Sequence, residues 1–356
     1  MDKAADCYSK AKTELKSIID SGTYSLVSNF ATNWDPAGFW NDECVWAMCS
    51  DEGGQWSSWG SDRTITFCNP NMFKWFTACP ENGGWGSQYL SWEWYACYEK
   101  GDTRRVVHPF KNAEGVWSGT KTEQFHFTNG EFAPAIWTTK IWRNANADSN
   151  GNSWGFQMWS PTIIYGKRYA NVLLDYAECC FRTGDENAGW AAIDEIRNRA
   201  WGNLTIGQDY SKYFGHFNNV YEANGQGITM TEYPVGVLTA AVTVPSAKEY
   251  YTMLQAKPNL VGYKHTSEVW KVAVNEERRK EFNSEWCLCP DMIKSGYMED
   301  HINYNYPKDD GGSDYANYPW SKRSFDFDIR KMDMPIPATE LMKNSLLKQN
   351  PAYAGN

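Results

Sequence analysis

Hydrophobic positions recur at helical spacing at the start of the chain and again in its second half. The first such segment begins near Asp2 and ends at Gly22, with apolar residues three or four positions apart between them. Residues 168–182 and 188–199 have the same spacing, and Thr183-Gly184-Asp185 lies between them as a turn. These two segments predict a helical hairpin of the tetratricopeptide kind.

Two further helices and a tail are predicted beyond residue 245. Ser246 and Glu249 have the spacing of a capping box, which predicts a helix through residue 257. A longer helix is predicted over 267–283, starting at its serine. From Pro335 the tail is predicted to be extended and then briefly helical.

The segment between the first helix and the hairpin has no long periodic pattern. A short strand is predicted over 41–48, and residues 51–90 are rich in Gly, Ser and Trp, as loops are. A short helix is predicted over 91–98, and residues 103–160 alternate short apolar and polar runs that are typical of hairpins and loops. The pattern therefore predicts an irregular region followed by a helical one.

The composition is unusual in its tryptophans. The 356 residues include 19 Trp, and 14 of these lie between Trp34 and Trp159, in the irregular region. The net charge of −9 argues against a nucleic-acid partner and against binding to an anionic membrane surface. No run of 18 apolar residues occurs, so no transmembrane helix is expected.

Five tryptophans are candidate ligand-binding residues because of where they lie. Trp56, Trp59, Trp75 and Trp85 lie in stretches rich in Gly, Ser and Asn, and Trp92 occupies a polar position of the predicted helix 91–98. Loops carry binding sites more often than they carry core packing. Exposed indoles with polar neighbours suit a sugar, whose pyranose face is apolar and whose rim is hydroxylated. Core packing is the alternative, and it is the interpretation that we favour for the helical residues Trp94, Trp190 and Trp270.

Two motifs within residues 146–157 are similar to sites of known chemistry. Gly151-Asn152-Ser153-Trp154-Gly155 matches Gly-x-Ser-x-Gly, but a loop precedes it where a nucleophile elbow needs a strand, so we interpret the match as coincidence. Asp148 and Asn150 have the oxygen spacing of a calcium loop but lack its final bidentate Glu and its flanking helices. They are candidate calcium ligands, and a turn rich in Asn and Gly is the favoured interpretation.

The remaining candidate groups favour structural roles. The five histidines are scattered and predict no zinc helix, and the ten cysteines include no Cys-x-x-Cys and are best interpreted as buried thiols. The run 276–281 contains Glu277 and Glu281 on one helical face, as an acid/base pair would be. Because Arg278 and Arg279 lie beside them, their pKa values should fall, which is wrong for a general acid. The run therefore predicts a structural ion-pair network.

Six segments, in chain order, resemble motifs of the SusD/RagB family of surface glycan-binding lipoproteins. They are Ser17 to Leu26 (I-I-x-S-G-x-Y-x-L), 98–104 (Y-x-x-G-D-x-R), 168–178 (R-Y-A-D-V-L-L-M-Y-A-E), 193–200 (I-N-x-V-R-x-R-A), 277–282 (E-R-R-x-E-L) and 335–353 (P-I-P-x-x-E, then Q-N-P-G-Y). The chain departs from the family pattern at Trp286, where the family has Gly, and at Leu288, where it has Arg. Together the segments cover nearly the whole chain.

The resemblance implies a mainly α fold, the SusD-like α-α superhelix of tetratricopeptide-like hairpins. It implies a single domain over residues 1–356, with 23–160 as a loop-rich ligand-binding part and 161–356 as a helical scaffold and tail. Family members hold oligosaccharides, or in some cases peptides, on the outer face of the outer membrane. They deliver them to a SusC-like TonB-dependent transporter without catalysis and without a cofactor.

Two alternatives to glycan delivery stay open at this point. The first is a peptide-binding or structural subunit of such a transporter complex, and the second is a glycoside hydrolase, since Trp-rich clefts also occur in those enzymes. The family has no fixed motif for its binding aromatics, so the five tryptophans rest on their loop placement alone.

The family's lipidated N-terminal cysteine and its first helical repeats have no counterpart in the sequence. Membrane attachment is therefore expected only through a lipid anchor that this chain lacks. The surface that those repeats would cover, near residues 168–200, is expected to expose a large apolar patch.

Overall fold

The computed structural model describes the helical regions and a few short segments between them. The described residues are 3–34, 38–50, 102–104, 110–111, 125–126, 132–133, 135–136, 140, 162–202, 244–256, 267–285, 287–302 and 328–353. Within them the fold is mainly helical, as the sequence predicts.

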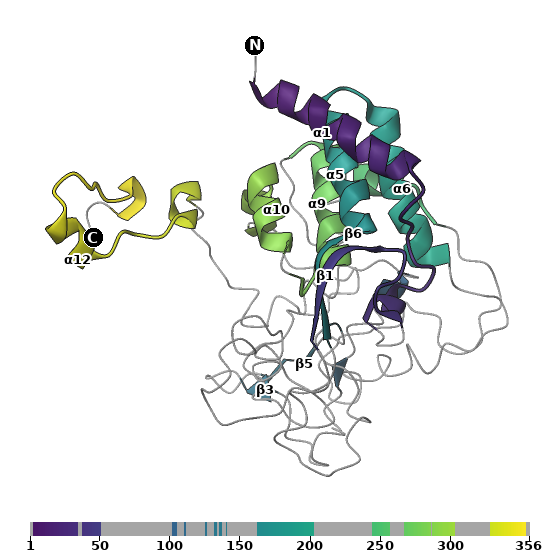
Figure 1. The fold of residues 1–356 in the computed structure, drawn as a ribbon, viewed down its shortest axis with the longest axis horizontal. Coiled ribbons are helices and arrows are strands. Elements are labelled where there is room, and N and C mark those ends of the chain that lie inside the picture. Colours follow the sequence, from purple (N-terminus) through teal and green to yellow (C-terminus); the bar gives the residue numbers. More distant parts are fainter. Residues whose placement is uncertain are drawn as a thin grey trace, which may run out of the picture.

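A helical hairpin forms the centre of the molecule. It consists of α5 (Tyr169–Arg182) and α6 (Glu186–Gly202), and α6 extends beyond its predicted bounds at both ends. Gly184 makes the turn with a φ of +82°, a conformation that favours glycine because it lacks a Cβ. α1 (Lys3–Asp20) packs against α5, and Gly22, two residues after its end, has a φ of +62°. The predicted first helix and hairpin are therefore confirmed (Figure 1).

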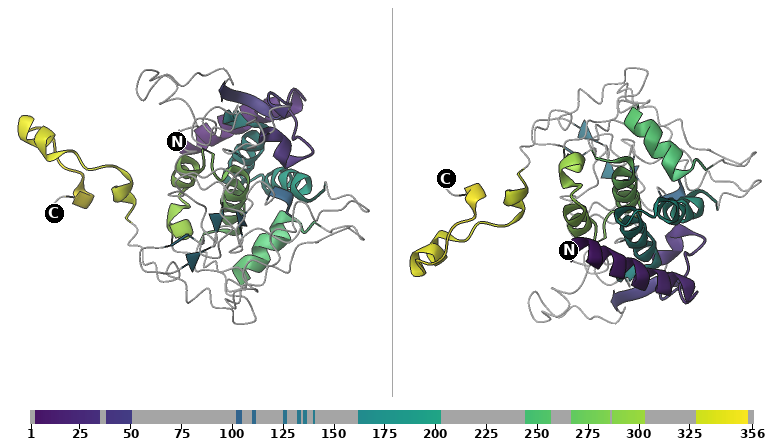
Figure 2. Two further views of the ribbon diagram at one scale, coloured as in Figure 1. Left: turned by 90° about the horizontal axis from the view of Figure 1, so that it is seen from below. Right: turned by 90° about the horizontal axis from the view of Figure 1, so that it is seen from above.

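Three helices cover the hairpin. α9 (Val269–Phe282) packs against both α5 and α6, and α8 (Ala247–Ala256) and α10 (Leu288–Ser295) pack against α9, as the two views of Figure 2 show. The predicted cap of α8 is present, because Ser246 Oγ accepts a hydrogen bond of 3.3 Å from the backbone N–H of Glu249.

The predicted start of α9 is wrong by two residues. Ser267 does not cap the helix: its backbone N–H donates to Asp300 Oδ2 at 2.8 Å, in the short helix α11 (Met298–Ile302). The residue that precedes α9 is Glu268, which has an extended ψ of 148°. Ser267 is therefore held by a contact with a distant element, which a local capping pattern does not encode.

Two strands join the irregular region to the helices. β1 (Cys44–Ser50) and β6 (Thr162–Arg168) pair antiparallel, with register shifts around Trp46. β1 begins later than predicted because Asn41 forms a turn, with its Oδ1 accepting the N–H of Glu43 at 2.8 Å. Short pairs of β2 (Phe110–Lys111) with β5 (Ala135–Ile136) and of β3 (Phe125–His126) with β4 (Phe132–Ala133) agree with the hairpins predicted over 103–160.

The apolar side chains form two cores. The larger lies between α5, α6, α8, α9 and α10, with Leu173, Ile193 and Val274 fully buried or nearly so. It includes Trp190, and Trp270 stacks on Phe181 with ring centroids 5.3 Å apart, so the predicted core role of these two tryptophans is confirmed. The smaller core lies beneath β1 and β6 and is built from Phe30, Trp34, Ile163 and Tyr165.

Cys179 and Cys180 of α5 agree with the prediction of buried thiols. Both are free and buried, and burial raises the pKa of the Cys179 thiol to about 11. The thiol of Cys180 also has a raised pKa, because of its burial. These two cysteines therefore act as small apolar core residues. Cys7 of α1 is exposed, so the prediction of a buried thiol is wrong for it.

The apolar patch expected around residues 168–200 is not found. Among the described residues, the large hydrophobic side chains that are exposed lie on other elements, because α1, α8 and α9 cover α5 and α6. The exposed side chains are Trp40, Trp46, Met48, Met253, Met334, Met342, Leu346 and Leu347.

The last four of these exposed side chains belong to the C-terminal segment. This segment contains η11 (Ile329–Met332), α12 (Ala338–Lys343) and η12 (Pro351–Tyr353), and it lies to one side of the helices in Figures 1 and 2. Its two ends are joined by the side chain of Gln349, which donates to and accepts from the backbone of Ile336 at 2.9 Å. The predicted extended and then helical tail is confirmed. No helix among the described residues is long and apolar enough to cross a membrane.

Candidate functional site

Residues 51–101 are called the Trp-rich segment. The structure describes the residues at both of its ends and not the tryptophans within it. The five candidate residues lie outside the described residues, and so do the candidate calcium ligands. They are Trp56, Trp59, Trp75, Trp85, Trp92, Asp148 and Asn150. Residues 51–101 begin where β1 ends at Ser50 and finish where the described residues Asp102 to Arg104 begin. Both ends of this segment are therefore fixed positions in the structure.

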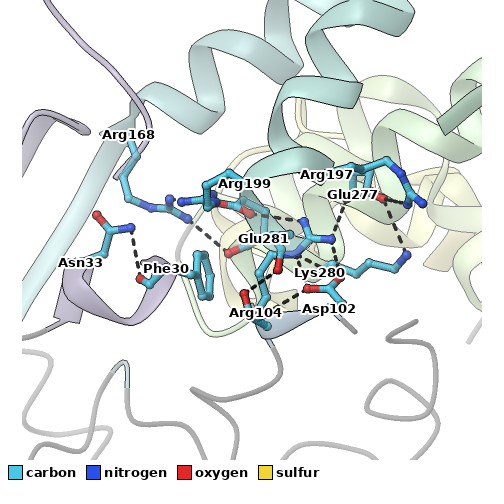
Figure 3. Close-up of polar contacts among 12 residues, drawn as sticks. Phe30, Asn33, Asp102, Arg104, Arg168, Arg197, Arg199, Glu277, Lys280 and Glu281 are labelled. Carbon is cyan, nitrogen blue, oxygen red and sulfur yellow. Dashed lines mark hydrogen bonds and ion pairs between the residues drawn. The ribbon is translucent and has the colours of Figure 1, made fainter. Parts of the chain in front are cut away.

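The run 276–281 is buried, although a charged run would usually face solvent. Every residue of α9 from Val272 to Phe282 is buried, including Glu277 and Glu281, which have no exposed area. Ions removed from water need close partners of opposite charge, because the cost of desolvating them is several kcal/mol each. Figure 3 shows that cationic side chains from distant parts of the chain converge on these two carboxylates. We call this set the buried charge cluster, and its members are Glu43, Asp102, Arg104, Lys140, Arg168, Arg197, Arg199, Glu277, Lys280, Glu281 and Glu285.

Three arginines surround Glu281. Its Oε1 lies 3.0 Å from Arg168 Nη1 and also pairs with Arg199, while its Oε2 lies 3.3 Å from Arg104 Nη1. Burial alone would raise the pKa of Glu281, but Arg199, Arg168 and Arg104 outweigh it and lower the pKa to about 2. Glu281 is therefore ionised throughout the neutral range.

Glu277, one turn earlier in α9, has a second set of partners. Its Oε1 lies 2.9 Å from Arg197 Nη1 and accepts the hydroxyl of Tyr251 at 2.7 Å. Its Oε2 lies 2.8 Å from Arg104 Nη2, so Arg104 joins the two carboxylates. Burial opposes ionisation, but Arg104 and Lys280 hold the pKa of Glu277 well below its usual range.

Arg104 is the link between the cluster and the Trp-rich segment. Asp102 binds it as a fork, with Nε to Oδ1 at 2.9 Å and Nη2 to Oδ2 at 2.6 Å. Both side chains are fully buried, and the neighbouring Thr103 hydroxyl donates to the backbone carbonyl of Ala200 in α6. The chain that follows residue 101 is therefore held to α9 by charge-assisted bonds, which are about twice as strong as neutral ones, and to α6 by a neutral hydrogen bond.

The other end of the Trp-rich segment is joined to the same cluster through Glu43, which precedes β1. Glu43 pairs with Arg168, and its Oε2 lies 3.0 Å from Arg199 Nη1. Asn33 donates to the same oxygen at 3.1 Å. The strand that leads to Ser50 is thus tied to β6 and α6 by buried contacts.

Lys140 adds a third anchor from the irregular region. Its Nζ donates to the backbone carbonyl of Glu281 and to Glu285 Oε1, both at 2.7 Å, and lies 4.4 Å from the centre of the Trp34 ring. Burial is the main effect on this ammonium and lowers its pKa to about 8, although Glu285 opposes the shift. The cation is held by charge, by a carbonyl and by an aromatic face together.

The predicted fall in the pKa of Glu277 and Glu281 is confirmed, but the predicted partners are wrong. Arg278 points away from them and pairs with Glu178 at 2.6 Å and with Asp175 at 2.8 Å. Arg279 pairs with Glu276. Adjacent residues on a helix point about 100° apart, so Arg278 faces α5, while Arg279 pairs within α9 itself. The interpretation of a structural ion-pair network is supported, with partners that come from distant segments.

The buried charge cluster draws on four of the six segments that carry the family resemblance. Arg104 comes from 98–104, Arg168 from 168–178 and Arg197 from 193–200, while Glu277 and Glu281 come from 277–282. Glu43 was not singled out from the sequence, and its signal is weak because it is one acidic residue in a polar turn. The motifs therefore encode how the scaffold holds the irregular region.

The cluster is suited to holding structure and not to acid/base chemistry. Glu277 and Glu281 are buried and bound to arginines that hold their pKa values below the usual range, so neither can give up a proton near neutral pH. In the described part of the chain, no group of three or more His, Cys, Asp or Glu side chains is placed to hold a metal ion.

A family comparison agrees with this arrangement. The model of the SusD family matches residues 125–353, which is well over half of the chain. The chain belongs to the SusD family. The match includes Lys140, the α5–α6 hairpin, α9 and the C-terminal segment.

Solved structures share the fold of this chain at low sequence identity. Surface glycan-binding protein A from Bacteroides thetaiotaomicron, in complex with laminarihexaose, is 17% identical, with a TM-score of 0.57 over 98% of this chain and 60% of that one. A SusD superfamily protein from Bacteroides vulgatus is 18% identical, with a TM-score of 0.54 over 99% and 61%. B. fragilis NanU is 18% identical, with a TM-score of 0.53 over 99% and 59%.

The SusD-family chain spans about three fifths of the length of these solved structures. At identities below one fifth, the likeness shows the fold alone. No curated protein matches the chain.

Proposed function

We propose that this chain binds a glycan through the tryptophans of residues 51–101 and does not transform it chemically. One observation carries the proposal: the buried charge cluster fixes both ends of the segment that contains Trp56, Trp59, Trp75, Trp85 and Trp92. Such a binding surface benefits from fixed ends. Each side chain that has to become ordered on binding reduces the binding free energy by about 0.5–1.5 kcal/mol.

Membership of the SusD family and the neighbour that holds laminarihexaose support a carbohydrate as the ligand. The net charge of −9 agrees with a ligand that is neutral, since an acidic protein repels anionic polymers. In this proposal the chain acts on the cell-surface side of the outer membrane. It passes the glycan to a SusC-like TonB-dependent transporter, as the family resemblance implies.

Affinity gel electrophoresis tests the proposal directly. The chain is run in native gels that contain laminarin, starch, xyloglucan, galactomannan or inulin, and we expect retardation by at least one of them. A variant with Trp56, Trp59, Trp75, Trp85 and Trp92 all replaced by Ala should run as in an empty gel. The matched control is Trp40→Ala, which removes an exposed indole outside this segment and should stay retarded.

The outcome that contradicts the site is clear. A five-tryptophan variant that keeps its circular-dichroism melt and is still retarded excludes this segment as the glycan site. A chain that no polysaccharide retards, but that binds peptides, favours the peptide-binding alternative.

The hydrolase alternative gains no support from the paired carboxylates. Glu277 and Glu281 are buried and bound by arginines, whereas a glycosidase needs one carboxyl that keeps its proton near neutral pH. Assay of reducing-sugar release on the polysaccharides above should show no increase over a protein-free sample.

A further inference from the structure

The outer face of β1 carries an exposed indole. Trp46 is 59% exposed and Met48 is 44% exposed, whereas Ala47 between them packs against the smaller core. Successive side chains of a strand point to opposite faces, so Trp46 and Met48 share the face that is turned away from that core. Exposure of a large apolar side chain to water on such a face is unfavourable in free energy, and the side chain adds nothing to the packing of the core.

Gly166 of β6 sets the position of this indole. A Cβ built on Gly166 would lie 1.7 Å from Trp46 Cε3 and 1.9 Å from its Cζ3. The six-membered ring of the indole therefore lies directly over the glycine, and only a residue without a side chain leaves room for it there. One side of the ring is packed on the backbone of β6 and the rest is exposed, so the ring is already ordered before a ligand arrives.

A polar pair includes the residue across from Trp46 in the strand pair. Lys167 is the register partner of Trp46, and its Nζ lies 3.1 Å from Asp175 Oδ2 of α5. The two side chains are 43% and 29% exposed. Together they offer hydrogen-bond donors and acceptors with no net charge, which is the polar complement that a neutral sugar ring and its hydroxyl groups require.

The size of this surface favours a sugar ring over a protein. Stable protein interfaces bury about 800 Å² on each partner, with some 20 or more residues on each side. The outer face of the β1–β6 pair has two large exposed apolar side chains among its described residues, Trp46 and Met48. One exposed indole matches the area of one or two pyranose rings.

We propose that Trp46, held on Gly166, is a stacking platform for a pyranose ring of a neutral glycan, with Lys167 and Asp175 hydrogen-bonding to its hydroxyl groups. This inference rests on the proposed function and extends that site onto the scaffold. The extension is continuous, because β1 ends at Ser50 and the next residue opens the Trp-rich segment.

Two variants test the platform in the same polysaccharide gels. Trp46→Ala removes the ring, and Gly166→Ala keeps it but forces it off the strand, since the new Cβ would overlap the indole. We expect each to weaken the retardation constant for the polysaccharide that retards the wild-type chain by about tenfold, the effect of losing one buried aromatic contact. Trp46→Phe, which keeps a smaller flat ring, should weaken it less.

Trp40→Ala is the matched control, because Trp40 is 60% exposed and lies before β1. Unchanged retardation of Trp46→Ala, while the five-tryptophan variant is no longer retarded, overturns the platform and leaves the proposed function intact. Equal weakening by Trp40→Ala and Trp46→Ala also overturns it, because the effect would then follow surface aromatic content. A wild-type chain that none of the polysaccharides retards overturns both proposals.

Discussion

Single charged residues in this chain matter through partners that lie far away in the sequence. Arg104 bonds to Glu281 across 177 positions and also binds Asp102, two residues before it. The fork with Asp102 is local, but its burial depends on α6 and α9. The Asp102–Arg104 pair therefore fixes one end of the Trp-rich segment.

Replacing Arg104 with Met should lower the free energy of unfolding by about 3–5 kcal/mol, because Asp102, Glu277 and Glu281 would lose a buried cation. Urea denaturation followed by circular dichroism measures this change. The chain contains a matched control: Arg330 binds Asp328 with the same two-residue spacing and the same fork, but on the surface. Arg330→Met should change stability little. Equal losses in the two variants would contradict the special role of the buried fork.

For single residues, the sequence predicts the direction of a pKa shift better than it predicts which charged side chains cause the shift. It predicts lowered pKa values for Glu277 and Glu281, because arginines are close in sequence. The arginines responsible are Arg104, Arg168, Arg197 and Arg199, which only the fold brings near. Periodicity does not show which of several arginines shares a helix face with a given carboxylate across the molecule.

Among the helices and strands, α9 makes the free energy of unfolding depend on pH. The pKa of Glu281 is about 2 in the folded chain and 4.5 in its ordinary state, so the unfolded chain binds more protons between these values. The stabilising contribution of Glu281 is complete above pH 4.5 and is lost as the pH falls toward 2. Glu277 changes in the same direction.

We therefore expect the urea midpoint to stay level from pH 7 to about 5 and to fall steeply below pH 4.5. Glu281→Gln should be less stable at pH 7 and should show a shallower fall, because it cannot gain this proton. Equal slopes for the wild-type chain and the variant would contradict the assignment.

The contact between α5 and α6 depends on a glycine. A Cβ on Gly189 would lie 2.8 Å from two ring carbons of Phe181, whose ring is held between Trp190 and Trp270. Gly to Ala within a helix ordinarily stabilises by about 0.5–1 kcal/mol. Here overpacking should reverse the sign, so that Gly189→Ala lowers the free energy of unfolding by about 1–3 kcal/mol.

Asn198→Ala is the control for this prediction, since Asn198 is exposed in the same helix and Ala should stabilise it slightly. Thermal melting of the two variants gives the comparison. A gain in stability for Gly189→Ala would show that Phe181 can move aside.

The helices and turns that are specified by residues close together in the sequence are predicted best. The α5–α6 hairpin follows from its periodicity and from the turn at Gly184, and α8 follows from its capping box. The start of α9 differs from prediction because Ser267 contacts Asp300 in α11, and the start of β1 differs because Asn41 forms a local polar turn with Glu43. Such contacts leave no mark on the local hydrophobic pattern.

For the molecule as a whole, we propose separate tasks for the charged and the aromatic residues. The charged residues of the SusD-family motifs lie inside and hold the scaffold to the irregular region. The tryptophans that are predicted to bind glycan lie in a segment between two of these anchors. The fold class was predictable because the motifs span the chain. The binding tryptophans stay a prediction, because loop placement is their only signal in the sequence.

Hydrogen–deuterium exchange with and without the polysaccharide that retards the chain most strongly tests this division of tasks. We expect slower exchange in residues 51–101 when the glycan is bound, and no change in α9, where the buried charge cluster is already closed to solvent. Protection that appears in α9 and leaves residues 51–101 unchanged would contradict it.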